Sequence, residues 1–205
     1  MAIPSALINL NNNVLAAVDV ETTGLLCGFH EIIQIAIVPL DSEIRPSATL
    51  RPFYMNIRPE HPERQRGAAG VHGIKVDELY NMAISQSKAS DLLDEWFIGL
   101  DLPAGKKLCA LAHNYPFERG FLTHWLGLDT FDSMWHPYSR DTMALALTIN
   151  DAASWHGRDL PFPRVSLKSL CNVFGIDIIN AHDALSDSIA TAALYREMLR
   201  SFGRK

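Results

Sequence analysis

Residues 14–25 read VLAAVDVETTGL, and this stretch indicates the centre of the fold. Five apolar residues precede Asp19, and Thr22-Thr23-Gly24 follows Glu21, so residues 14–21 are typical of a buried central strand that ends in a loop. Successive side chains of a strand point to opposite faces, so Asp19 and Glu21 lie on the same face of the sheet.

The two acids at the end of this apolar strand indicate a cation site. Neighbouring carboxylates repel each other, and a positive ion between them would relieve the repulsion. Oxygen ligands with no thiolate nearby favour Mg²⁺ or Mn²⁺. The simpler alternative is that Asp19 and Glu21 only mark the exit of the strand into a loop.

The rest of the chain predicts how this strand is surrounded. Strands are expected at residues 31–40 and 49–57, with the second at an edge because of Pro52, and the three strands form an antiparallel meander. A further strand is expected at residues 107–112. Five helices are expected at residues 87–100, 116–126, 141–153, 166–174 and 183–202. This order predicts an α/β fold with a mixed sheet flanked by helices, in a single domain over residues 1–205.

The composition is that of a globular protein, with 48% hydrophobic and 20% charged residues. Lys and Arg number 18 against 23 Asp and Glu, and the net charge of -5 argues against a general binder of polyanions. Cys27, Cys109 and Cys171 are far apart and odd in number, which favours a reduced, cytoplasmic setting over a disulfide framework or a zinc cluster. We expect no targeting segment and no membrane partner, because no apolar stretch is long enough to cross a bilayer.

Two later segments, like residues 19–24, contain acidic side chains. Residues 113–118 read HNYPFE and residues 182–187 read HDALSD. With residues 19–24 they resemble, in order and spacing, the motifs D-x-E-T-T-G, H-N-x-x-F-D and H-x-x-x-x-D of the DEDDh group of 3′→5′ exonucleases, the DnaQ-like family. The motif-bearing part covers about residues 14–202. The resemblance implies an RNase H-like fold, with a mixed sheet of five strands in which parallel strands follow the meander.

The resemblance also implies a reaction and its residues. Four carboxylates would hold two divalent ions, Mg²⁺ or Mn²⁺, with Asp19 as the bridging ligand: Asp19, Glu21, Glu118 and Asp187. Such a pair of ions activates water and stabilises both the entering and the leaving oxygen of a phosphodiester. His182 would be the general base, since imidazole titrates near neutrality. The expected products are nucleoside 5′-monophosphates.

A further set of residues would contact the terminal nucleotide by the same resemblance: Thr22, Thr23, Gly24, Leu25, His72, Asn114 and Phe117. Glycine at position 24 permits a close approach, and Leu25 would wedge against the last bases. Two of these residues could instead have a structural role. Phe117 also fits the apolar face of a helix, and His72 also fits a hinge in a loop. Asp141 precedes Thr142 and an apolar run, and is predicted to cap a helix.

One position departs from the family pattern. The second motif normally ends in aspartate, whereas this chain has Glu118, which is longer by one C–C bond of about 1.5 Å. We expect Glu118 to remain a metal ligand, directly or through water.

Three functions fit these residues. The first is a 3′→5′ exonuclease that acts on single-stranded or frayed DNA. The second is an exoribonuclease of the same fold, and the third is a non-catalytic module that binds nucleic acid or a polymerase. A polymerase partner and the oligomeric state are left open. Two divalent ions would offset the charge of the four site acids, so we expect the protein to hold a few terminal nucleotides at its metals.

Overall fold

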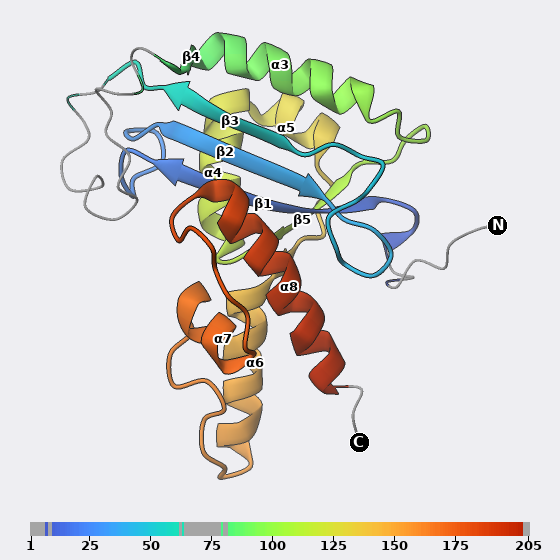
Figure 1. Cartoon of the computed structure of the whole chain (residues 1–205), viewed down its shortest axis with the longest axis vertical. Coiled ribbons are helices and arrows are strands. Elements are labelled where there is room, and N and C mark those ends of the chain that lie inside the picture. Colours follow the sequence, from blue (N-terminus) through green and yellow to red (C-terminus); the bar gives the residue numbers. More distant parts are fainter. Residues whose placement is uncertain (1–6, 8–9, 62, 64–78, 80–81, 203–205) are drawn as a thin grey trace.

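The structure is a computed structural model, and it describes residues 7, 10–61, 63, 79 and 82–202. A mixed sheet lies at its centre (Figure 1). The strands β1 (Val14–Thr22), β2 (Ile32–Pro39) and β3 (Phe53–Arg58) form the predicted antiparallel meander. The strand β5 (Leu108–Ala112) pairs in parallel with β1. The two-residue strands β4 (Ile84–Ser85) and β6 (Arg140–Asp141) pair in parallel with β3 and β5.

The described part of the chain therefore has a six-stranded sheet in the order β4-β3-β2-β1-β5-β6. This confirms the predicted α/β class and mixed sheet. The predicted number of five strands is one too few, because β4 and β6 are too short to leave a pattern in the sequence. β3 pairs with β4 only through Ile57 and Arg58, so most of β3 lies at an edge, as Pro52 indicated.

Helices cover both faces of the sheet. Their bounds are α3 (Gln86–Gly99), α4 (Tyr115–Leu126), α5 (Leu128–Met134), α6 (Thr142–Trp155), α7 (Leu167–Val173) and α8 (Ala184–Phe202). Five of these were predicted to within two residues at each end. The short helix α5 was missed, since seven residues between two longer helices show little periodicity.

The side chains of β1 point alternately to the two faces of the sheet, and each face has its own hydrophobic core. Val18 and Val20 pack on the face covered by α3 and α4, for example against Leu122. Ala17 packs on the other face with Tyr195 of α8. Asp19 and Glu21 have the same parity as Ala17, so they point to the side of the sheet on which α8 lies.

The remaining helices extend the α8 side of the molecule. α6 and α7 pack on α8 around Ala146, Leu170 and Leu194. Gly175 ends α7 as predicted: it has φ +66°, and the amide of Ile176 donates to the carbonyl of Cys171. Among the described helices, none combines the length and the apolar character that crossing a bilayer requires.

Candidate active site

The first two acids lie at the end of β1, where its pairing with β2 becomes irregular. Asp19 stands opposite Ala36 and Glu21 opposite Gln34, and the register shifts between Glu21 and Thr22. Such a bulge ends regular pairing and redirects the chain. The two carboxylates therefore lie where the sheet opens into the loop.

The third acid, Glu118, comes from the first turn of α4 and is only 3% exposed. The start of this helix is held by Asp141. The Asp141 carboxylate accepts hydrogen bonds from the amides of Asn114 (3.1 Å) and Tyr115 (2.9 Å). Asp141 also accepts from the amides of Met143 (2.8 Å) and Ala144 (3.1 Å), which confirms the predicted cap of α6. One carboxylate thus fixes the starts of two helices.

The fourth acid, Asp187, lies in the first turn of α8, beside His182. The backbone amide of His182 donates to Asp187 Oδ2 at 3.2 Å, and His182 has φ +66°, a value that few non-glycine residues adopt. Glu21, His182 and Asp187 each offer a ligand atom within 4.8 Å of the other two, so they can share a metal ion. The histidine is exposed, whereas Asp187 is half-buried.

The four carboxylates influence one another electrostatically. Burial raises the pKa of Asp19 most, and the charges of Glu118, Glu21 and Asp187 raise it further. Burial, followed by the charge of Asp187, raises the pKa of Glu21 to about 8. The pKa values of Glu118 and Asp187 are also raised, chiefly by burial. The folded chain therefore brings the four carboxylates of β1, α4 and α8 close to one another.

This site suits a divalent cation. Among the described residues, Glu118 Oε2 and Asp187 Oδ1 are buried and have no hydrogen-bond partner. Unsatisfied buried carboxylate oxygens are costly, and mutual repulsion adds to that cost. A cation that takes oxygen ligands would remove both penalties, so the residues present fit the ion that the sequence implies.

The loop after β1 is stabilised by its own threonines. The Thr22 hydroxyl donates to the carbonyl of Gly24 at 2.6 Å, and the buried Thr23 hydroxyl accepts from the amide of Glu31 at 3.0 Å. A Cβ atom on Gly24 would lie 2.4 Å from the ring of His30, so glycine is favoured here by packing within the protein. Leu25 is 81% exposed beside this loop.

The other expected nucleotide contacts have varied surroundings. Asn114 is exposed and has the left-handed φ of 77°. Phe117 is half-buried, packs against the core on the α4 side, and lies 4.8 Å from the ring of Phe121 between centroids. His72 lies outside the described residues. The roles of Thr22, Thr23, Gly24, Leu25, His72, Asn114 and Phe117 toward a nucleotide stay predictions.

A fifth acid near the site, Asp183, was not singled out from the sequence. Its charge adds to the raised pKa values of Asp19 and Glu21. It accepts a hydrogen bond of 2.6 Å from the hydroxyl of Tyr54, and burial together with this bond raises the pKa of Tyr54 to about 12. The one available signal was the position of Asp183 directly after His182.

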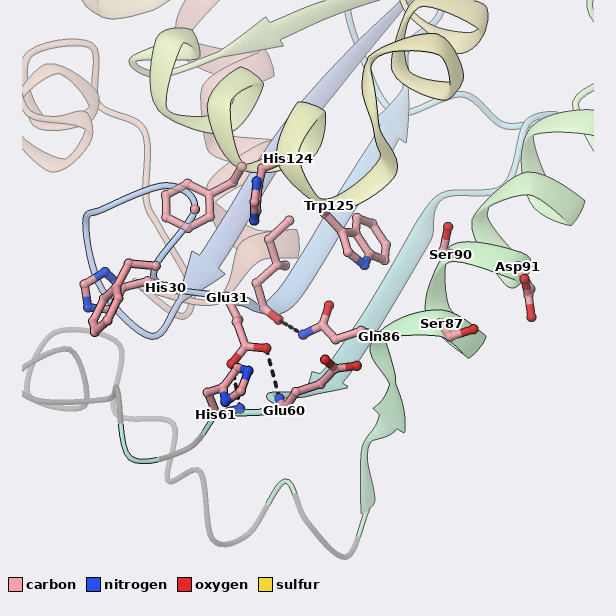
Figure 2. A pocket seen from close by; sticks show the side chains of 14 residues that line it. His30, Glu31, Glu60, His61, Gln86, Ser87, Ser90, Asp91, His124 and Trp125 are labelled. Atoms are coloured by element: carbon pink, nitrogen blue, oxygen red, sulfur yellow. Dashed lines mark hydrogen bonds between the residues drawn. The ribbon is translucent and has the colours of Figure 1, made fainter.

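A separate pocket of about 480 Å³ lies between the starts of α3 and β2 and the end of α4 (Figure 2). In Figure 2, the Glu31 carboxylate accepts from the amides of Glu60 (3.0 Å) and His61 (2.8 Å), and Gln86 donates to the carbonyl of Ile32. The four site carboxylates do not line this pocket. Glu31 and Gln86 of its lining are therefore engaged in hydrogen bonds within the protein.

Comparison with known proteins agrees with this geometry. A family model described as "Exonuclease" matches residues 16–195. DNA polymerase III subunit epsilon of Rickettsia conorii is 28% identical over 88% of this chain and 71% of its own length. The PolC-type DNA polymerase III of Thermotoga petrophila is 27% identical over 95% of this chain, which spans 13% of that protein.

Solved structures show the same fold at lower identity. The crystal structure of E. coli Exonuclease I in complex with a dT13 oligonucleotide superposes with a TM-score of 0.72 and 22% identity, over 93% of this chain. The present chain spans 43% of that enzyme. The cell-death related nuclease 4 superposes with a TM-score of 0.68 at 18% identity.

The sheet has the RNase H-like fold of these solved structures, and the family model that matches residues 16–195 defines the class of the protein as an exonuclease. Since the family model matches most of its length, the chain belongs to the DnaQ-like 3′→5′ exonuclease family. It is therefore a hydrolase.

Proposed function

We propose that this protein is a metal-dependent exonuclease that removes nucleotides from the 3′ end of single-stranded or frayed DNA. The observation that carries the proposal is the convergence of Asp19, Glu21, Glu118 and Asp187 from β1, α4 and α8, with raised pKa values and two unpartnered buried oxygens. We also propose that residues 1–205 form a single exonuclease domain.

These four carboxylates would hold the metal, as two Mg²⁺ or Mn²⁺ ions. When bound, such ions supply an activated water and stabilise the charge on both oxygens of the scissile bond. Glu118 would bind a metal ion although its side chain is one methylene longer than that of aspartate. It lies in the first turn of α4, and hydrogen bonds to Asp141 fix the start of that helix.

His182 would accept the proton of the attacking water. Its exposed side chain is free to meet solvent and substrate, and its backbone amide is tied to Asp187. Neutral imidazole is a suitable base near physiological pH. The released nucleotide would be a 5′-monophosphate.

DNA is favoured over RNA as the substrate by the relatives. The R. conorii and T. petrophila proteins are named as parts of DNA polymerase III, and the E. coli Exonuclease I structure contains a dT13 oligonucleotide. The name of the epsilon subunit also suggests a polymerase partner for this chain, which co-elution with a replicative polymerase would test. The cytoplasmic setting inferred from the cysteines stays a prediction.

The test uses single-stranded DNA and RNA of one sequence, each with a labelled 3′-terminal nucleotide, in Mg²⁺, Mn²⁺ or EDTA. We expect release of labelled mononucleotide from DNA with either metal and none in EDTA. Absence of release from both substrates with both metals would refute the proposal. Faster release from RNA would replace DNA with RNA as the substrate.

Two variants with matched controls test the residues. We expect Asp19→Ala and His182→Ala to abolish release while thermal stability is kept, because His182 is exposed and the loss of Asp19 removes one of several mutually repelling carboxylates. Asp151→Ala and His156→Ala remove exposed residues of the same kinds in and after α6, and should leave release unchanged. A large loss of stability in both site variants would instead indicate a structural role.

A further inference from the structure

A row of polar side chains crosses the sheet beside the active site. Gln34 of β2 stands directly opposite Glu21 of β1 on one side and Asn56 of β3 on the other. Residues paired in this way point to the same face, so all three face α8. Gln34 is 5% exposed and is the only polar residue in β2, which otherwise reads as a continuous apolar strand.

The side-chain amide of Gln34 has a hydrogen-bond partner at both of its ends. Its nitrogen donates to Asn56 Oδ1 (2.8 Å) and to the hydroxyl oxygen of Tyr54 (3.1 Å). Its oxygen accepts from the backbone amide of Ala184, the first residue of α8, at 2.8 Å. A buried amide with partners for both its nitrogen and its oxygen has one favourable orientation, so Gln34 joins α8 to the sheet at a defined distance.

Tyr54 makes a second connection to the same turn. Its hydroxyl donates to Asp183 Oδ2 at 2.6 Å, and Asp183 Oδ1 accepts from the backbone amide of Ser186 at 3.0 Å. Both oxygens of Asp183 are therefore occupied by hydrogen bonds within the protein. Asp183 caps the helix and is itself held by Tyr54.

The turn that these bonds hold carries two residues of the reaction. His182 directly precedes Asp183, and the amide of Asp187 donates to the carbonyl of Asp183 at 2.9 Å. Figure 1 shows the start of α8 lying beside the strands of the meander. A shift of this turn would move His182 and Asp187 together relative to Asp19 and Glu21, which belong to β1.

We propose that Gln34 and Tyr54 are positioning residues, which hold Asp183 and the start of α8 so that His182 and Asp187 face the acids of β1. This inference rests on the proposed function of His182 and Asp187. Misplacement of a reacting group by about 1 Å costs up to about a hundredfold in rate. We therefore expect the loss of these hydrogen bonds to lower kcat more than it changes KM.

The first test is Tyr54→Phe, which removes only the hydroxyl. Tyr54 is 40% exposed, so the variant should fold normally. We expect kcat on single-stranded DNA to fall about tenfold, with KM changed by less than about twofold. Tyr138→Phe is the matched control, because Tyr138 is 69% exposed and lies in the segment before β6. A kcat for Tyr54→Phe equal to that of Tyr138→Phe would overturn the proposal.

The second test distinguishes hydrogen bonding from a direct role of the Asp183 charge. Asp183→Asn keeps an oxygen that can accept from the Ser186 amide, and its amide nitrogen can donate to the Tyr54 hydroxyl oxygen in a bond of reversed direction, whereas Asp183→Ala keeps neither bond. Positioning predicts a kcat for Asp183→Asn well above that of Asp183→Ala. Equal losses in the two variants would show that the charge matters, and would overturn the positioning role.

The third measurement does not depend on activity. Amide hydrogen exchange in EDTA should be faster for residues 182–187 in Tyr54→Phe than in the unaltered protein, and unchanged in α6. Unchanged exchange at residues 182–187 would overturn the proposal even if kcat fell. If the unaltered protein releases no nucleotide, the proposed function fails, and the exchange data still decide whether Tyr54 holds the start of α8.

Discussion

Replacement of Asp141 by alanine should destabilise the protein and disorder the start of α4. The Asp141 carboxylate accepts four backbone hydrogen bonds, two from the cap of α6 and two from the amides of Asn114 and Tyr115. Alanine offers no acceptor at this place. The variant would therefore leave two helix starts without their partner at once.

The size of the effect can be worked out from these bonds. Loss of a helix N-cap costs about 1 kcal/mol. The amide of Tyr115 is partly buried, and leaving such a donor without an acceptor costs about 1–3 kcal/mol. The sum is about 3 kcal/mol, and a protein of this size loses about 2–4 °C of melting temperature per kcal/mol, so we expect a decrease of about 6–12 °C.

The assay is thermal unfolding followed by circular dichroism, with Asp151→Ala as the control. Asp151 is an exposed residue of the same helix, and its replacement should change the melting temperature by less than about 2 °C. Nucleotide release by Asp141→Ala should also be reduced, since α4 carries Glu118. A melting temperature equal to that of Asp151→Ala would refute the idea that one carboxylate fixes both helices.

Four other predictions concern the acids and the loop. In EDTA, the free energy of unfolding should fall as pH rises from about 4.5 to about 8. In this range folded Glu21, with its pKa of about 8, still holds a proton that the unfolded chain has lost. Urea titrations should show a smaller decrease in the free energy of unfolding for Glu21→Gln. Mg²⁺ should raise the melting temperature more at pH 8 than at pH 5, since protons compete for the same oxygens, and an equal rise would count against the site. Glu118→Ala should lower Mg²⁺-dependent nucleotide release about a hundredfold, and unchanged release would remove Glu118 from the ligands. Leu25→Ala should raise KM for single-stranded DNA with little change in stability, because its side chain is 81% exposed, and an unchanged KM would exclude the wedge role.

Much of the fold could be predicted because the decisive signals are local. The apolar run of β1 and its two acids, the cap of α6 at Asp141 and the glycine after α7 depend on neighbours a few residues away. The strands β4 and β6 and the helix α5 could not be predicted in this way. They are short, and they form because longer elements bring their chain segments together.

The three sequence motifs were enough to predict the class of the protein and the four acids of the candidate site. The contacts that hold those acids in place depend on the folded arrangement of the chain. Gln34 and Ala184 are 150 residues apart, and they meet because the register of β2 places Gln34 opposite Glu21 while α8 packs across the same face. Asp141 likewise reaches Asn114 and Tyr115 only because β6 lies beside β5. The alternating pattern of a strand specifies the face of the sheet on which a side chain lies. The residue that it meets on the neighbouring strand depends on long-range pairing, which cannot be predicted from the local sequence.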